Sequence, residues 1–78
     1  MKLREMKAGD KGRVKGFTEA DPQYRQKLLR MGLNRNAEFS VIRKAPFGGP
    51  IEIEVRGFRL VLRSNEADVL EVEPRENA

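Results

Sequence analysis

Apolar and polar side chains alternate most regularly in the middle of the chain. Residues 51–55, Ile-Glu-Ile-Glu-Val, alternate apolar and acidic side chains at every position, which is the period of a strand with one buried face. Residues 38–43 and 58–63 show the same period, so three consecutive strands are predicted. Two short connections join them as turns: residues 45–50 are rich in glycine and proline, and residues 56–57 are Arg-Gly. The prediction is a β-meander with one face in water and one face that must be covered.

The third of these strands and the first turn contain the apolar residues that are hardest to place. The alternation points Phe58, Leu60 and Leu62 inward and leaves Val61 facing outward. Phe47 lies at the tip of the 45–50 turn, Ala-Pro-Phe-Gly-Gly-Pro. A large apolar group at a turn tip is either folded under the turn or offered to a partner. Both alternatives stay open for Phe47 at this point.

The segments before the meander predict a short turn and a bent strand. Leu3 and Met6 are three residues apart, which indicates a single helical turn that places two apolar side chains as a lid. Residues 11–17 predict the first strand. Its glycines, Gly12 and Gly16, are typical of a bulge or a sharply bent barrel strand.

Residues 21–33 predict the main helix. Asp21 is a favourable N-cap, and Pro22 stands in the first turn, where proline is tolerated. Gly32 is the expected left-handed stop, and Leu33 can fold back onto the helix as in a Schellman motif. The apolar stripe has helical spacing and is widened by one further leucine; it consists of Tyr24, Leu28, Met31 and Leu29.

The end of the chain predicts one more helical turn and one more strand. Residues 64–68 form the turn, capped by Ser64 or Asn65. The strand that follows points Leu70 and Val72 inward, and residues 74–78 are expected to be a frayed tail.

Together these elements predict a mainly β, single domain over residues 1–78. Five short strands with a helix after the first form a small, partly open barrel of SH3-like or OB-like type. The length of 78 residues favours the SH3-like five-stranded barrel.

Composition excludes most catalytic and metal chemistry. The chain has no cysteine and no histidine, which removes disulfides, thiolate nucleophiles and the imidazole ligands that ferrous iron prefers. Carboxylates alone, Glu71 with Glu73 or Asp68 with Glu66, would bind hard cations weakly. We therefore expect no enzyme, no catalytic residues, no cofactor and no tight iron site. With no long apolar run, the chain is expected to be cytosolic and not inserted in a membrane.

The net charge of +4 is unevenly distributed. Residues 1–36 hold ten Lys or Arg against four Asp or Glu, and residues 37–78 hold six against eight. Opposite charges in the two halves predict ion pairs between neighbouring strands. The alternative is a small basic nucleic-acid-binding module, whose affinity would fall steeply with salt. The scarcity of aromatic residues counts against base stacking, and also against a groove for proline-rich peptides.

Two sequence segments, together with a short motif that follows them, resemble a known family. Residues 24–33, Tyr-Arg-Gln-Lys-Leu-Leu-Arg-Met-Gly-Leu, and residues 43–51, Arg-Lys-Ala-Pro-Phe-Gly-Gly-Pro-Ile, followed by Leu-Val-Leu-Arg at 60–63, resemble the FeoA family of ferrous iron uptake. The resemblance implies a small SH3-like accessory protein that binds and modulates FeoB, a membrane iron transporter with a cytosolic G-protein domain. The family usually has Pro-Gly where this chain has Arg35-Asn36. Iron-dependent repressors of the DtxR type contain a similar barrel, but they also carry a helical DNA-binding domain and histidine ligands.

The expected partner is therefore a protein, and self-association stays open. Candidate contacts are the apolar groups that the core does not explain and the basic edge of the helix. The groove between the helix and the barrel could open and accept an apolar segment. The candidate interface residues are Arg25, Leu28, Arg30, Met31, Pro46, Phe47, Gly48 and Val61.

Overall fold

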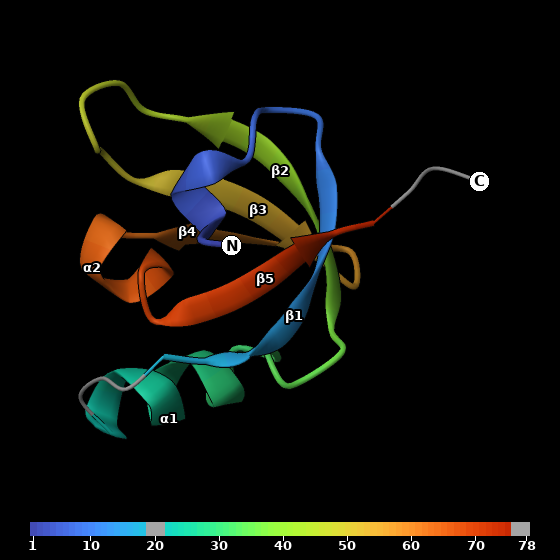
Figure 1. Ribbon diagram of the computed structural model, residues 1–78, viewed down its shortest axis with the longest axis vertical. Helices are drawn as coiled ribbons and strands as arrows, with labels where there is room; N and C mark the ends of the chain where they lie inside the picture. The colour runs from blue at the N-terminus through green and yellow to red at the C-terminus, as the bar shows by residue number, and fades with distance from the viewer. Residues whose placement is uncertain (19–21, 76–78) are drawn as a thin grey trace.

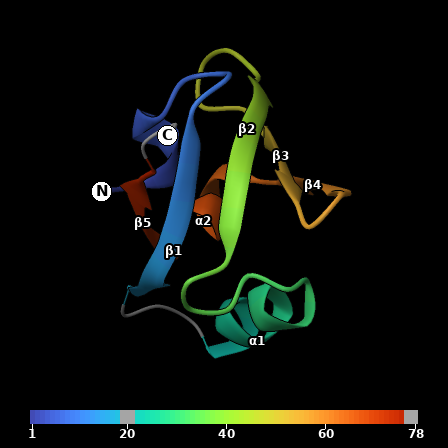
Figure 2. The same cartoon turned by 90° about the vertical axis from the view of Figure 1, so that its right-hand side faces the viewer.

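Five antiparallel strands form one strongly curved sheet in the computed structural model, which describes residues 1–18 and 22–75 (Figure 1). The strands are β1 (Lys11–Phe17), β2 (Glu38–Lys44), β3 (Ile51–Val55), β4 (Phe58–Leu62) and β5 (Leu70–Pro74). Their order in the sheet is β4-β3-β2-β1-β5. Figure 2 shows the edge strands β4 and β5 curving back behind β1 and β2, with α2 (Ser64–Ala67) between them.

The predicted meander and the predicted bend in the first strand are confirmed. Strand β3 pairs with β2 on one side and with β4 on the other. The register of β1 against β5 shifts between Val14 and Gly16, which is the bulge that the glycines indicated. Gly12 lies against the core, because a Cβ atom there would be 2.8 Å from Phe39 Cζ.

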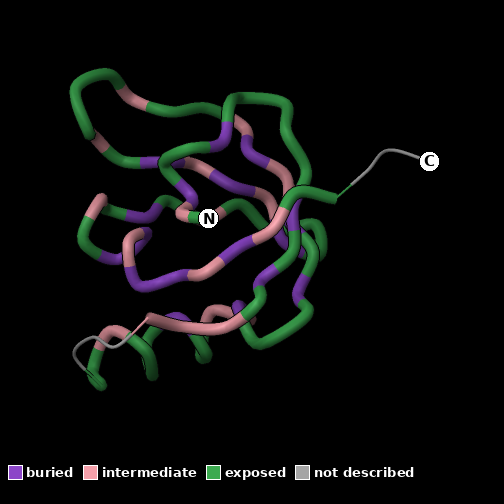
Figure 3. Tube along the Cα trace, in the orientation of Figure 1, coloured by how far each residue is buried: buried purple, intermediate pink, exposed green. Residues whose placement is uncertain are grey.

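The core is enclosed by the concave face of the sheet, and Figure 3 shows the buried segments gathered there. Alternate residues of β3 are buried, as the pattern predicted. Leu3 and Met6 are both buried around the 3₁₀ helix η1 (Leu3–Glu5), so the predicted lid is confirmed. Leu70 and Val72 of β5 are buried as expected.

The main helix, α1 (Pro22–Arg30), ends as its sequence indicates. Gly32 has φ of +90°, and two bonds complete the Schellman motif. The amide of Leu33 donates to the carbonyl of Leu28 at 3.0 Å, and that of Gly32 donates to Leu29 at 3.1 Å. Leu28 is fully buried. The predicted N-cap, Asp21, lies outside the described residues.

Three details of the sequence prediction are wrong. Phe58 points to the inner side but is 72% exposed, because β4 is an edge strand and Phe58 stands at its first position. Leu29 is 41% exposed and does not widen the buried stripe. Neither Ser64 nor Asn65 caps α2, because the N-cap is Arg63 and its amide donates to Glu66 Oε1 at 3.0 Å.

Ion pairs join the two halves of the chain, as the charge distribution predicted. The pairs of the described residues include Arg13 with Glu73 at 3.0 Å across β1 and β5, and Arg4 with Asp68. Exposed pairs of this kind each contribute at most about 1 kcal/mol. Pro74 belongs to β5, and the amide of Arg75 donates to the carbonyl of Lys11 at 2.8 Å, so the frayed tail expected at 74–78 does not include these two residues. Residues 76–78 lie outside the described residues.

Candidate functional site

The turn between β2 and β3, residues 45–50, contains the most exposed of the large apolar candidate residues. The amide of Gly49 donates to the carbonyl of Pro46 at 3.2 Å, which closes a β-turn. Both central residues have positive φ, +59° at Phe47 and +73° at Gly48, as in type I′ turns. The Phe47 side chain is 103% exposed. Of the two alternatives left open by the sequence, the structure therefore has Phe47 offered to solvent.

Close backbone packing stabilises this turn at its base, where β2 and β3 meet it. The amide of Ala45 donates to the carbonyl of Pro50 at 2.9 Å, where the two strands leave the turn. A Cβ atom at Gly49 would lie only 2.7 Å from the Cβ of Ala45, so glycine is required there. The backbone of the turn is thus well supported, and it holds Phe47 at the tip of the turn.

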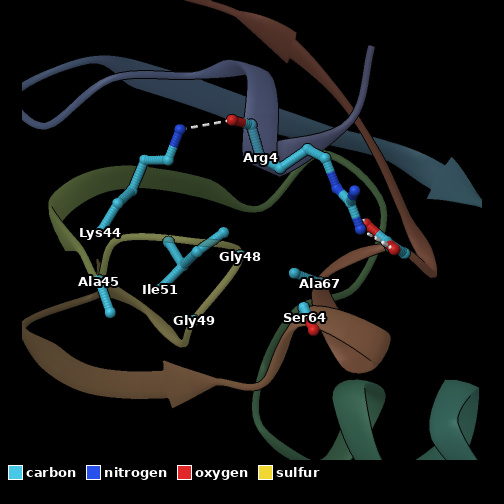
Figure 4. A pocket seen from close by; sticks show the side chains of 9 residues that line it. Arg4, Lys44, Ala45, Gly48, Gly49, Ile51, Ser64 and Ala67 are labelled. Atoms are coloured by element: carbon cyan, nitrogen blue, oxygen red, sulfur yellow. Dashed lines mark hydrogen bonds and ion pairs between the residues drawn. The ribbon is translucent and has the colours of Figure 1, made fainter.

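A cavity of about 260 Å³ opens beside the turn, between η1, the 45–50 turn and α2 (Figure 4). Gly48 and Gly49 form one wall, and Ile51 and Ala67 supply apolar surface. Pockets for drug-sized ligands usually measure roughly 300–1,000 Å³, so this cavity has the size for a side chain rather than a cofactor.

The charged groups around the cavity are already engaged within the chain. Lys44 Nζ donates to the carbonyl of Arg4, and the Arg4 guanidinium pairs with the carboxylate of Asp68. Figure 4 shows these two interactions at the rim. They tie η1 to β2 and to the end of α2, so the rim of the cavity is held by three separate elements.

The four candidate residues of the helix region lie far from this turn. Figure 1 shows α1 and the 45–50 turn at opposite ends of the long axis of the molecule. Arg30 is exposed, and the guanidinium of Arg25 lies over the ring of Phe17 at 5.6 Å. Met31 is half-buried against the core, and Leu28 has no exposed surface.

Val61 belongs to a third location, the outer face of β4, where it is 60% exposed. The candidate residues therefore form three separate groups. Only Pro46, Phe47 and Gly48 are brought together into one exposed surface of the turn.

The most unusual charged group is Glu66 in α2. Its side chain is buried although it is acidic. Glu66 Oε2 accepts a hydrogen bond from Lys27 of α1, while Oε1 accepts the bond from the Arg63 amide. The bond from Lys27 lowers the pKa of the Glu66 carboxyl, and the Arg63 amide lowers it further, against the opposing effect of burial. Glu66 thus connects α2 to α1 through a buried carboxylate.

In the described ranges 1–18 and 22–75, no group of three or more His, Cys, Asp or Glu side chains lies close enough together to hold a metal ion. The carboxylates considered from the sequence are otherwise engaged: Glu66 with Lys27, and Asp68 with Arg4. In the same ranges, no helix has the length and apolar composition needed to span a membrane.

Sequence reasoning missed the cavity and the role of Glu66. No sequence signal could have indicated the cavity, because Arg4, Lys44 and Asp68 are brought together only by the tertiary fold. Glu66 had a weak signal, since a glutamate at the third position of a helix is the usual acceptor for the N-cap amide. The non-standard N-cap, Arg63, concealed it.

Comparison with known proteins identifies one family over most of the chain. The family model described as FeoA domain matches residues 1–74. A FeoA-like protein from Clostridium acetobutylicum is 33% identical with a TM-score of 0.85, and the match covers 100% of this chain and 90% of that one. The FeoA protein from Chlorobium tepidum is 43% identical with a TM-score of 0.84, over 95% of this chain and 70% of that one.

The same fold also occurs inside a larger protein. A manganese-dependent transcriptional repressor in complex with manganese is 25% identical with a TM-score of 0.88. The match covers 96% of this chain but only 36% of the repressor. The family match extends over nearly the whole chain, and on that ground this chain belongs to the FeoA family.

Proposed function

We propose that this protein binds a FeoB-type membrane iron transporter and modulates its activity. Membership of the FeoA family implies a role in ferrous iron uptake. Within that role the chain acts as an accessory protein, with protein contact as its means. Several of its charged side chains are paired within the chain, as at Arg4 with Asp68 and Lys27 with Glu66.

The exposure of Phe47 is the observation that carries the proposal. A left-handed backbone conformation costs a non-glycine residue about 1–2 kcal/mol, and Phe47 has φ of +59°. Burial of the ring does not offset this cost, because the ring is fully exposed. Glycine would suit the position better, so an aromatic group there serves something other than the stability of this domain.

The test is affinity capture of the transporter from membranes of a host that contains it, at low and high salt. We expect the wild-type protein to retain the transporter at both salt concentrations, because an aromatic contact is little affected by screening. The variants are Phe47→Glu and Phe47→Gly. Phe47→Gly removes the ring and also relieves the strained φ, so added backbone strain cannot account for a loss of capture by this variant.

Lys15→Glu on β1 is the control for added negative charge, because Lys15 is exposed and lies outside the turn. It should capture the transporter as the wild type does. Absence of the transporter from the wild-type eluate would contradict the proposed function. Equal capture by the wild type and both Phe47 variants would remove the turn from the contact and leave the partner assignment standing.

A further inference from the structure

The two edges of the sheet are treated differently in this fold. The outer edge of β5 is covered by the beginning of the chain. The amide of Val72 donates to the carbonyl of Met1 at 2.9 Å, and Lys2 forms a β-bridge with Glu71. The outer edge of β4 has no such cover: across the described part of the chain, no backbone hydrogen bond joins β4 to any element except β3.

The hairpin geometry identifies which groups of β4 face outward. Arg56 and Gly57 connect β3 to β4 with φ of +52° and +84°, the conformation of a two-residue type I′ turn. In such a hairpin the flanking residues, Val55 and Phe58, form a hydrogen-bonded pair. Every second residue along β4 then bonds to β3, and the residues between them direct their backbone groups away. The amides and carbonyls of Arg59 and Val61 are therefore free to pair with another strand.

The side chains on the two faces of β4 define what that strand must carry. On the inner face, Phe58 is 72% exposed and Leu60 is half-buried, although the residues of β3 that pair with them are buried. A strand added at the edge would cover them with apolar side chains. On the outer face stands Arg59, whose ion pair with Glu52 is long at 4.0 Å, and Glu52 also pairs with Arg43 at 2.8 Å.

Positive charge is concentrated along this edge. Arg56 precedes the strand, Arg59 lies within it, and Arg63 follows it, all with exposed side chains. An acidic residue on the outer face of an added strand would lie directly across from Arg59, where opposite charges are favourable.

We infer that the β4 edge receives an extended segment of another protein as an additional strand, with apolar side chains inward and acidic side chains outward. The strand that already pairs with β4 has this pattern: β3 reads Ile-Glu-Ile-Glu-Val. The inference rests on the proposed function in one respect, since it identifies the transporter as the source of the segment. The mode of binding is β-augmentation, in which main-chain bonds supply affinity and alternate side chains supply specificity.

A second copy of this chain fits the edge less well. Its own β3 is enclosed between β2 and β4 and cannot pair again. It could offer only its β4, and antiparallel pairing of two such strands brings the arginines of both copies to one narrow edge. Like charges across neighbouring strands are unfavourable.

A short peptide tests the edge without the transporter. The probe is an acetylated and amidated Ile-Glu-Ile-Glu-Val, and the matched control is Ile-Lys-Ile-Lys-Val. Binding is followed by amide chemical shifts and by hydrogen exchange of the intact protein. We expect the acidic peptide to slow exchange at the amides of Arg59 and Val61, the two outward amides that an added strand would bond.

Two variants separate the charge from the backbone. Arg59→Glu should weaken binding of the acidic peptide about fivefold to tenfold, by reversing a cross-strand pair. Val61→Pro removes the outward amide at an edge position, where proline is tolerated. It should abolish the protection of the Arg59 amide by the peptide. Lys15→Glu on β1 reverses a charge in the same way as Arg59→Glu and should leave the affinity unchanged within about a factor of two, because β1 is separated from β4 by β2 and β3 and the exposed charge is screened.

Several results would overturn the inference. These are absence of binding, equal binding of the basic peptide, and shifts confined to the cavity beside Arg4 and Lys44. Concentration-dependent protection of β4 without peptide would assign the edge to a second copy. Transporter capture by Arg59→Glu equal to that of the wild type would also overturn it, and would leave the proposed function intact.

Discussion

Replacement of Glu66 tests how the two helices are held against each other. Glu66 is 4% exposed, and its two oxygens accept bonds from Lys27 and from the Arg63 amide. Glu66→Ala removes both bonds and leaves a small void. Loss of the helix cap costs about 1 kcal/mol and loss of a bond to a half-exposed lysine about 0.5–1 kcal/mol, and the void adds a similar amount. We expect a decrease of about 2–3 kcal/mol in the free energy of unfolding, from this sum.

Glu66→Gln isolates the contribution of the charge. Glutamine retains an oxygen that can accept from the Arg63 amide, but it has no negative charge for Lys27. We expect this variant to lose about 1 kcal/mol at pH 7, because the lysine is partly screened by solvent.

The cost of Glu66→Gln should depend on pH in a defined direction. The Glu66 pKa in the folded protein is lowered from its ordinary value of 4.5. Stabilisation by the charge is therefore complete above about pH 4.5 and is lost as the pH falls through the folded pKa. At the acid end the wild-type carboxyl is protonated and resembles glutamine, so the two proteins should converge in stability.

Urea unfolding followed by far-ultraviolet circular dichroism, at pH 7 and at several points below 4.5, measures these differences. A cost of Glu66→Gln that stays constant down to the acid end would refute the role of the Lys27 pair. A cost of Glu66→Ala below about 0.5 kcal/mol would refute the whole account of Glu66 as a buried link, since surface substitutions fall in that range.

Two further predictions concern packing and use matched pairs within the chain. Gly12→Ala should destabilise the protein by about 1–3 kcal/mol through overpacking, because its Cβ would meet Phe39 Cζ at 2.8 Å and the Glu73 carbonyl at 3.0 Å. Gly16→Ala, whose nearest contact would be Arg35 Nη2 at 3.6 Å, should change stability by less than about 0.5 kcal/mol; equal costs in urea titrations would contradict the packing argument. Leu28→Ala should cost about 2–5 kcal/mol, since Leu28 is fully buried. Leu29→Ala, at the neighbouring exposed position, should cost less than about 1 kcal/mol, and a thermal midpoint that falls more for Leu29→Ala would reverse the assignment of the helix face.

Sequence periodicity predicted the strands well because one face of each is buried. The alternation in β3 and β5 matches their burial residue by residue. The same rule was wrong for Phe58, since alternation reports the side of the sheet and not whether a neighbouring strand covers it. The position of β4 at the edge follows from the closure of β1 against β5, a pairing between distant parts of the chain that periodicity does not show.

The candidate interface could be predicted only in part. Phe47 was identified because a large apolar group stood among turn residues, and its exposure follows from its place at the tip of the turn. The helix residues were grouped with it because of the basic edge of the helix and the groove expected between the helix and the barrel. Their separation from the turn depends on how α1 docks at the far end of the barrel, which Figure 1 shows and local sequence cannot determine.

The adjacency of β1 and β5 has a consequence for synthesis of the protein on the ribosome. The hairpins of β2, β3 and β4 join near neighbours in the chain, so they can form as soon as those segments emerge. Val14 instead lies opposite Val72 in the register, which places its burial near the end of translation. A nascent chain halted before β5 exposes this apolar seam and becomes a substrate for chaperones or proteases.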